Sequence, residues 1–390
     1  MRTIYLDYNA TTPLDADVRA AMLPILDEVW GNPSSVHHVG QRARSLLDDA
    51  RERVAATLKC KPSEIIFTSG GSESTNLALH GMARQLRGKG RHIITSAVEH
   101  HAVLSPCEYL ANNEDFEVTF LPVNSAGRVA VQSVREALRS DTVLVSIMAA
   151  NNEVGTLQPV AEIGELCTDK GIVFHTDAVQ CFGKMAMNGI ANFNADLVSL
   201  CAHKFHGPNG AGLLYAKSPL MPDPIVHGAP HENERRAGTE NLPGIIGLAE
   251  AIVRFLPNPV FPMETLAPLA GNLMEMVDAT EGATFLGDRD SAKRLTNTIS
   301  FTVEGTDSIA LLSGLDLEGV CASAGSACAS GSVTPSHVAL AMGAPPAEAN
   351  ALVRLSLGRE TSANEIAAAC EIIPRVVERC RSANKMGITR

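Results

Sequence analysis

The sequence has no basic cluster and carries an excess of negative charge. Of its 390 residues, 32 are lysine or arginine and 43 are aspartate or glutamate, which gives a formal net charge of −11. Proteins that bind nucleic acid contact its phosphates through clustered lysine and arginine side chains, and no such block stands in this sequence. The composition therefore argues against a nucleic-acid-binding role.

Long apolar runs and paired cysteines are also absent. No apolar run approaches the roughly 20 residues of a membrane-spanning helix. The first residues, Met1–Asp7, turn polar too early for a secretory signal peptide. Nine cysteines are scattered between Cys60 and Cys380 without the close pairs of zinc sites. Such thiols are typical of a reducing compartment, so we predict a cytoplasmic protein with no membrane anchor and no metal site.

The residues that are present describe a globular α/β chain. Hydrophobic residues make up 45% of the sequence and charged residues 19%, and the length allows two or three domains. From residue 64 onward, short β-branched runs alternate with helical patterns. Strands are expected at residues 64–68, 92–95, 118–121, 142–148, 172–175 and 197–200. This alternation predicts a mainly parallel sheet between two layers of helices.

A composition shift marks the expected domain boundary. Prolines between residues 257 and 262 interrupt the pattern after Leu256. We therefore predict a large α/β domain over residues 15–257. A smaller α+β domain would be formed by residues 1–14 together with residues 258–390.

The C-terminal region has its own helix and strand signals. A helix is expected near residues 263–276 and a strand at residues 298–302. A long final helix follows Ser362, which forms a capping-box pattern with Glu365.

A lysine stands directly after an expected strand, in the segment Ala202–Pro208. Lys204 lies between two histidines and is followed by a Gly-Pro turn, an unusual place for a solvated surface charge. Its amine could form a Schiff base with an aldehyde where burial or a neighbouring charge lowers its pKa. For this short motif alone, a surface lysine is the commoner explanation.

An acid and an amide end another expected strand, in the segment His175–Gln180. The carboxyl ends of parallel strands face the crevice where such sheets bind ligands. Asp177 could hold a pyridine nitrogen in its protonated form, and Gln180 could bond a neighbouring ring oxygen. The alternative for Asp177 is a helix N-cap.

A third element is the turn Thr68–Glu73 between an expected strand and helix. Its glycines allow close approach to the backbone, and the free N–H groups of a helix start suit a phosphate. Turns of this kind are common in α/β proteins, so this one has weight only beside the other two. A phosphate cradle, a pyridine partner and a Schiff-base lysine, in this order, indicate pyridoxal 5'-phosphate (PLP) as the cofactor.

The three elements resemble the fold-type I PLP enzymes of the class V aminotransferase group. More closely, the chain resembles the cysteine desulfurases of the NifS/IscS type. The resemblance extends over nearly the whole chain, through Tyr5–Thr12, Gly31–Ser35, Glu99–Val103, Asn151–Glu153, Arg236–Asn241 and Leu355–Arg359. It implies the PLP-dependent transferase fold, and an enzyme that removes sulfur from L-cysteine to give L-alanine.

The resemblance also implies roles around the cofactor ring. Lys204 would carry the cofactor and move protons at the substrate, and Asp177 would keep the pyridine nitrogen protonated. Gln180 and Asn152 would contact the side of the ring that bears the hydroxyl. His100 would stack on the ring face and serve in proton transfer.

Phosphate and substrate contacts are implied in the same way. Gly71, Ser72 and His203 would bind the phosphate, with Cys201 beside it. Thr239 would reach the phosphate of a neighbouring subunit, which implies a homodimer with shared sites. Arg354 would bind the substrate carboxylate with its bidentate fork, assisted by Asn32.

The desulfurase assignment depends on Cys328, in the segment Ser323–Gly331. This cysteine stands among Ser, Ala and Gly, so we expect a flexible loop that exposes its thiol. The thiol would take the sulfur as a persulfide and pass it to an acceptor or cluster-scaffold protein. Cys321 precedes the loop in a short apolar run and is expected in the core, with a role in sulfur relay left open.

Three positions depart from the family pattern. Cys201 stands where serine is usual, Gly228–Pro230 replaces three glycines, and Asn209 replaces a common lysine. Serine at the first position normally touches the phosphate, and a thiol is a weaker hydrogen-bond partner. We therefore expect lower cofactor affinity. Alanine and proline also restrict the backbone near Pro230.

Two alternatives stay open at this point. The first is another class V PLP enzyme, such as a selenocysteine lyase, against which the long small-residue loop around Cys328 argues. The second is a weakly active scaffold partner in a sulfur-transfer complex, supported by the departures at Cys201 and Pro230.

Overall fold

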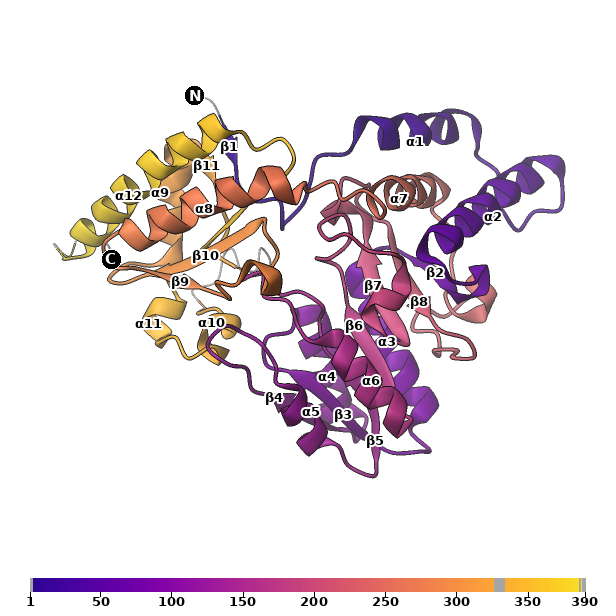
Figure 1. The fold of residues 1–390 in the computed structure, drawn as a ribbon. Helices are drawn as coiled ribbons and strands as arrows, with labels where there is room; N and C mark the ends of the chain where they lie inside the picture. The colour runs from indigo at the N-terminus through magenta and orange to yellow at the C-terminus, as the bar shows by residue number, and fades with distance from the viewer. Residues whose placement is uncertain (1–2, 326–333, 386, 388–390) are drawn as a thin grey trace.

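The computed structural model describes residues 3–325, 334–385 and 387. Its helices and strands form two groups that stand side by side (Figure 1). One group surrounds a seven-stranded sheet, and the other surrounds a three-stranded sheet built from the C-terminal part of the chain. None of the helices in these residues is both long and apolar enough to cross a membrane.

The larger sheet has the strand order β2-β8-β7-β6-β5-β3-β4. Its strands are β2 (Ile65–Thr68), β3 (His92–Ser96), β4 (Glu117–Leu121), β5 (Thr142–Ser146), β6 (Val173–Asp177), β7 (Leu197–Cys201) and β8 (Gly212–Ala216). The pairs from β4 through β3, β5 and β6 to β7 are parallel, and β8 is antiparallel to both of its neighbours. The prediction of a mainly parallel sheet is confirmed, and the six predicted strands agree with the structure to within two residues at either end.

Helices cover both faces of this sheet. They are α1 (Ala16–Glu28), α2 (His38–Leu58), α3 (Gly71–Leu86), α4 (His101–Asn113), α5 (Val131–Ala137), α6 (Val160–Lys170) and α7 (Leu242–Phe255). Adjacent residues of a strand point to opposite faces, and the core divides accordingly. Ile66 packs in one cluster with α3 and α4, whereas Phe67 packs in another with α2, α6 and α7. The sheet therefore lies between two helical layers, as predicted.

The smaller group is an antiparallel sheet with helices packed on it. Its strands follow the order β12-β10-β9. They are β9 (Ala283–Leu286), β10 (Thr298–Val303) and β12 (Leu352–Ser356), with the helices α8 (Met263–Ala279), α9 (Ser308–Leu317), α10 (His337–Ala341), α11 (Pro346–Ala349) and α12 (Ala363–Lys385). The capping box before α12 is confirmed: Ser362 N donates to Glu365 Oε2 at 2.8 Å, and Glu365 N donates to Ser362 Oγ at 3.3 Å.

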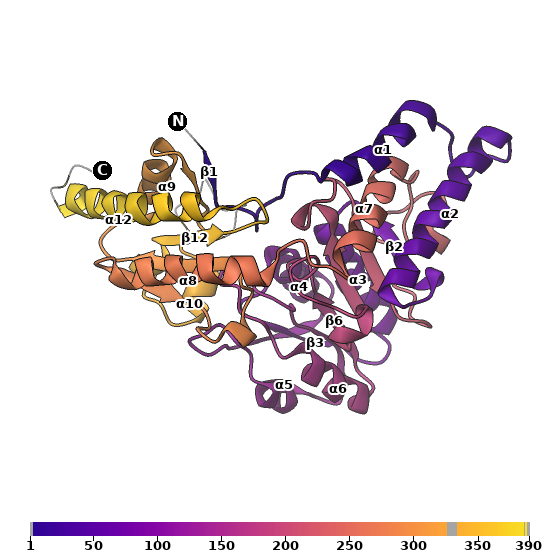
Figure 2. The same cartoon turned by 45° about the horizontal axis from the view of Figure 1, so that its top comes forward.

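The N-terminal strand lies with the C-terminal elements. β1 (Ile4–Tyr5) pairs in parallel with β11 (Val320–Cys321), far from β2 in both views (Figure 2). The next residues cross from this group to α1, so the N-terminal segment lies between the two sheets. The domain boundaries at residues 14–15 and 257–258 stay a prediction. Cys321 is only half-buried, which corrects the expectation that it lies in the core.

Candidate active site

A cavity of about 260 Å³ opens where the parallel strands end. Residues that follow β5, β6 and β7 form one wall, the start of α3 forms another, and the N-terminal segment and β12 close the third side. Ten of the predicted site residues line it: Gly71, Ser72, His100, Asn152, Asp177, Gln180, Cys201, His203, Lys204 and Arg354. These residues lie far apart in the sequence and are brought together by the carboxyl ends of neighbouring strands, where such sheets bind ligands.

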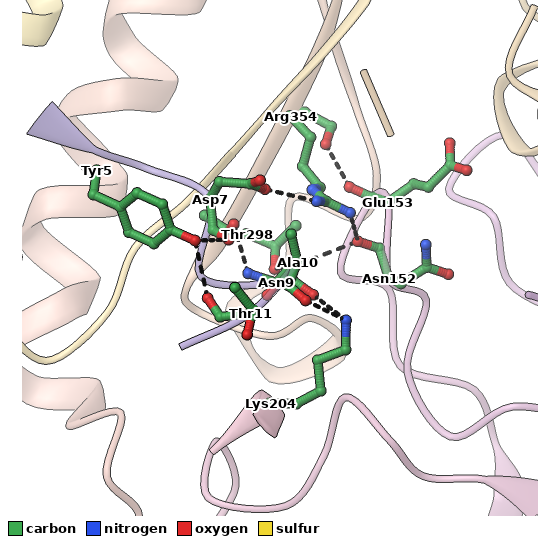
Figure 3. Close-up of polar contacts among 12 residues, drawn as sticks. Tyr5, Asp7, Asn9, Ala10, Thr11, Asn152, Glu153, Lys204, Thr298 and Arg354 are labelled. Carbon is green, nitrogen blue, oxygen red and sulfur yellow. Dashed lines mark hydrogen bonds and ion pairs between the residues drawn. The ribbon is translucent and has the colours of Figure 1, made fainter. Parts of the chain in front are cut away.

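Lys204 is held by the N-terminal segment rather than by solvent. Its Nζ donates hydrogen bonds to the backbone oxygens of Asn9 and Ala10, both at 2.8 Å (Figure 3). Burial lowers the pKa of this amine below its ordinary value. A lysine with a lowered pKa has a larger neutral fraction near neutral pH, which is the form that adds to an aldehyde.

Asp177 is a buried carboxylate at the end of β6. Its Oδ1 accepts a hydrogen bond from Val179 N at 3.0 Å, so it caps the turn that follows the strand. It also lines the cavity, and burial raises its pKa to about 6. No helix begins directly after Asp177, so the helix N-cap considered from the sequence is wrong, and the residue is a cavity-lining carboxylate held by a turn.

His100 is the N-cap of α4. Its Nδ1 accepts a hydrogen bond from Ala102 N at 3.0 Å, which assigns the ring proton to Nε2. Burial, and then the positive charge of Lys204, lower its pKa to about 4, so the ring is neutral near pH 7. A neutral ring in this tautomer can stack and donate from Nε2, whereas action as a base at Nδ1 requires loss of the cap.

The start of α3 forms a cradle beside Cys201. A Cβ on Gly71 would lie 2.7 Å from Val179 Cγ2, so only glycine fits at this point. Within the described residues no side chain caps this helix start, which leaves backbone N–H groups for a ligand. Burial raises the pKa of the Cys201 thiol to about 11, which keeps the sulfur protonated beside the cradle. His203 also lines the cavity, with Nδ1 3.2 Å from Thr11 Oγ1.

Arg354 enters the cavity from β12. Its Nη2 pairs with Asp7 Oδ1 at 2.8 Å and its Nη1 donates to Asn152 O at 3.0 Å (Figure 3). Its Nε is buried, and among the residues that the structure describes it has no hydrogen-bond partner. A buried donor without a partner is costly, so this guanidinium has capacity for a further acceptor such as a carboxylate.

Two predicted residues lie outside the cavity of this chain. Asn32 is exposed in the turn before α2, where its Oδ1 accepts from Ser34 N at 2.8 Å. Thr239 lines a separate hollow near the end of β2, beside Arg236. The role of Thr239 toward a neighbouring subunit stays a prediction, and Asn32 is not brought to Arg354 within the chain.

Cys328 lies outside the described residues, but both flanks of its segment are described. Ser323 pairs with Arg354 through backbone bonds of 2.7 and 3.1 Å. Gly325 lies against the buried Glu153, because a Cβ on it would stand 2.5 Å from Glu153 Oε2. Ser336 Oγ donates to the same carboxylate oxygen at 2.6 Å. Both flanks therefore contact Glu153, the neighbour of the cavity residue Asn152.

Sequence reasoning missed Asn9 and Lys184. Asn9 bonds Lys204 through its backbone oxygen and Lys184 through its side chain. Its place in the first family segment was a signal, but no role could be assigned to it there. Lys184 stands four residues after Gln180, a spacing that was the available signal.

Comparison with known proteins places the chain in a family. The model of the class-V aminotransferase family matches residues 4–368. Cysteine desulfurase IscS of Dictyoglomus turgidum is 44% identical over 381 residues, which cover 98% of this chain and 96% of that protein. Cysteine desulfurase IscS of Methanosarcina thermophila is 42% identical, over 99% of this chain and 94% of that protein.

Solved structures agree with these relatives. A NifS-like protein superposes with a TM-score of 0.88 at 34% identity, over 97% of this chain and 100% of that one. A structure described as SspA in complex with cysteine superposes with a TM-score of 0.79 at 35% identity, over 92% of this chain and 100% of that one. With the geometry of the cavity, these matches show that the chain belongs to the class-V aminotransferase family, among its cysteine desulfurases of the NifS and IscS type.

Proposed function

We propose that this chain is a PLP-dependent cysteine desulfurase that converts L-cysteine to L-alanine and carries the sulfur as a persulfide on Cys328. The observation that carries the proposal is the cavity itself. An amine, a buried carboxylate, an uncapped helix start and an arginine line one space of about 260 Å³. The family membership adds that relatives of this chain, at 44% identity, are named cysteine desulfurases.

The side chains present fit PLP group by group. Lys204 suits the aldehyde, Asp177 the pyridine nitrogen, and Gln180 the ring oxygen. The uncapped start of α3, at Gly71 and Ser72, suits the phosphate. When bound, PLP supplies an electron sink that stabilises negative charge at the substrate carbon.

The chain's own residues supply binding and proton movement. Arg354 holds the substrate carboxylate, and Lys204 takes the proton from the substrate Cα, because its lowered pKa favours the neutral amine. His100 stacks on the ring and offers a hydrogen bond from Nε2. Asp177, ionised, keeps the pyridine nitrogen protonated.

Sulfur transfer requires a thiolate. The thiolate of Cys328 attacks the substrate sulfur and the bond between that sulfur and the substrate Cβ breaks. The electron pair of the broken bond stays with Cβ. That carbon takes a proton and leaves as L-alanine, while the sulfur stays on Cys328. An acceptor or cluster-scaffold protein then takes the sulfur. The described residues on either side of this segment, Gly325 and Ser336, both contact Glu153, which follows the cavity residue Asn152.

The test uses the purified protein with PLP and L-cysteine. We expect L-alanine and sulfide in equal amounts when a reducing thiol is present. Borohydride reduction should fix the pyridoxyl group on Lys204, as peptide mass spectrometry can locate. The variant Lys204→Ala should lose both results, whereas Lys170→Met, at an exposed lysine that ends α6, should keep them. A pyridoxyl group on another residue would show that the lysine assignment is wrong.

Substrate competition separates the alternatives. A clear preference for selenocysteine over cysteine would favour a selenocysteine lyase. Tight cofactor binding without turnover of either would favour a scaffold partner. Equal amounts of alanine and sulfide from cysteine would contradict both.

A homodimer is part of this proposal. Thr239 lies outside the cavity of its own chain, so a phosphate contact requires a second subunit. The segment from α1 to α2 exposes Trp30 (80%) and Val36 (89%), an apolar surface that a partner would cover. An active, fully cofactor-bound monomer in analytical ultracentrifugation would contradict the dimer.

A cytoplasmic location is also proposed. The cysteines of the described residues are free thiols, a state maintained in reducing compartments. Cell fractionation with a specific antibody checks this point.

A further inference from the structure

Lys184 is a buried lysine behind the cavity that the proposed reaction does not use. It follows β6 in a turn, is 6% exposed, and does not line the cavity. Its Nζ donates to Asn9 Oδ1 at 2.6 Å and to Gln180 Oε1, and lies 5.2 Å from the centre of the Phe261 ring. Lysine is almost never fully buried without a partner, so this placement calls for a reason.

The Lys184 amine can donate a hydrogen bond to both Asn9 Oδ1 and Gln180 Oε1 in either of its protonation states. Among the described residues, the charged and titratable groups that interact with Nζ are Lys204, Arg354, His203, Cys181 and Cys201. Burial, and then the two cations, hold the pKa of Lys184 well below its ordinary value. An ammonium has three N–H groups and a neutral amine has two, so each amide oxygen receives an N–H in both forms.

This contact determines which end of the Gln180 amide faces the cavity. With Oε1 bonded to Lys184, Nε2 donates one hydrogen to Asn9 O at 3.2 Å. Its second hydrogen is left for a ligand in the cavity that Gln180 lines. In the reversed orientation, Oε1 would face the oxygen of Asn9, which is repulsive in either protonation state of Lys184. Nε2 would face the lysine nitrogen, which has no acceptor when it is an ammonium and a single lone pair when it is neutral.

The same lysine also fixes Asn9. The Asn9 side chain donates from Nδ2 to Thr298 Oγ1 at 2.8 Å, and its Oδ1 accepts from Lys184. The backbone oxygen of Asn9 is one of the two acceptors of Lys204. Lys184 therefore connects Gln180, which lines the cavity, with Asn9, whose backbone oxygen bonds Lys204.

We propose that Lys184 is a positioning residue that orients the Gln180 amide so that its N–H, and not its carbonyl oxygen, faces the ring oxygen of the bound cofactor. This inference rests on the proposed function, because it needs PLP in the cavity. An N–H donated to the ring oxygen stabilises negative charge there and weakens its hold on the proton of the Lys204–cofactor link. Loss of that donor should therefore raise the pH midpoint of the visible absorbance of the bound cofactor.

The experiment measures that midpoint in holoenzyme variants. Lys184→Met retains the length of the side chain and removes its donors, and should raise the midpoint by about one pH unit, the size expected for one hydrogen bond. Gln180→Met should raise it by a similar amount. Because Lys184 acts through Gln180, the double variant should shift no further than Gln180→Met alone. The control is Lys59→Met, an exposed lysine that also donates to an amide oxygen, that of Asn188, and it should leave the midpoint unchanged.

Each other outcome contradicts the inference. Additive shifts would show that Lys184 acts by its charge through space, and an unchanged midpoint in cofactor-bound Lys184→Met would show that it orients nothing. A second variant, Lys184→Gln, retains a donor for one of the two amide oxygens, so we expect it to raise the pH midpoint less than Lys184→Met does. If neither Lys184 variant folds with cofactor, the residue is needed for folding and the positioning role is wrong. A wild-type protein that develops no cofactor absorbance would overturn the proposed function and this inference together.

Discussion

Arg354 and Asp7, which are 347 residues apart, form an ion pair at 2.8 Å with only 2% of the arginine side chain exposed. The pair exists because the N-terminal segment runs beside β12, with a bridge between Asp7 and Ser356. The charge of the guanidinium is thus balanced before any substrate enters. A substrate carboxylate would add a second acceptor to a side chain that is already held in place.

We predict that Asp7→Asn destabilises the substrate-free protein and makes its thermal stability depend more strongly on a bound ligand. The change leaves the buried charge of Arg354 unbalanced and should lower the free energy of unfolding by about 2–4 kcal/mol. L-Alanine brings a carboxylate to Arg354, so it should raise the melting temperature more in the variant than in the wild type. Thermal unfolding with and without L-alanine measures both effects.

The control for Asp7 is Asp17→Asn. Asp17 pairs with Arg254 on the surface, where an ion pair contributes about 0–1 kcal/mol. This variant should unfold close to the wild type, and L-alanine should stabilise it to the wild-type extent. Equal stability of Asp7→Asn and wild type would show that the pair does not balance Arg354.

The cavity residues that the sequence predicts stand where a strand ends or a helix begins. Asp177 ends a strand, Lys204 comes shortly after one and Gly71 begins a helix, so the pattern around each residue locates it at the carboxyl ends of the sheet. β8 is absent from the prediction because it pairs antiparallel with β7 after a short connection, without the helix that separates parallel strands.

Asn9 and Lys184 could not be given roles from sequence for a different reason. Asn9 accepts hydrogen bonds from Lys184 and from Lys204, which are 175 and 195 positions away in the sequence. No local pattern encodes such contacts, because they depend on the N-terminal segment crossing between the two sheets. Asn32 is a case of the opposite kind: a family motif suggested its role, and the fold of the single chain places it elsewhere.

We predict a pH-dependent effect of Asp177→Asn on the cofactor-free protein. Burial raises the pKa of Asp177 to about 6, whereas an unfolded aspartate has a pKa near 3.9. The folded protein therefore holds an ionised, buried carboxylate above pH 7, at a cost of about 3 kcal/mol that disappears as the pH falls from about 6 to 4. The neutral amide of the variant would carry no such cost, so the variant should be more stable than wild type at pH 8 and nearly equal at pH 4.

Denaturant unfolding of both proteins at several pH values measures this difference. The same variant should retain PLP poorly, because a neutral amide lacks the negative charge that stabilises a protonated pyridine nitrogen. A stability difference that does not change with pH would show that burial does not raise the pKa of Asp177 above its unfolded value.

We predict that Cys201→Ser strengthens cofactor retention. The sulfur lies beside the start of α3, and burial keeps the thiol protonated, with a pKa of about 11. A serine hydroxyl is a better partner for phosphate, and the gain should be about 0.5–1.5 kcal/mol, or a two- to tenfold lower dissociation constant by the same estimate. Cys167→Ser, at a buried cysteine of α6 outside the cavity lining, should leave the dissociation constant unchanged. Equal or weaker retention in Cys201→Ser would contradict the idea.

The final prediction concerns Cys328 and tests where the sulfur goes. Cofactor binding and removal of the Cα proton depend on Lys204 and the cavity, so Cys328→Ala should still bind PLP and L-cysteine with the wild-type spectral change. Transfer of the sulfur needs a thiolate, so the variant should release no sulfide and carry no persulfide. Mass spectrometry of the wild type after brief treatment with L-cysteine should place the added sulfur on Cys328.

Cys321→Ala is the matched control, because Cys321 is half-buried on the near flank of the same segment, and it should retain the persulfide. Loss of the persulfide in Cys321→Ala would instead assign that residue to a relay, and normal turnover by Cys328→Ala would mean that sulfur leaves without a protein thiol.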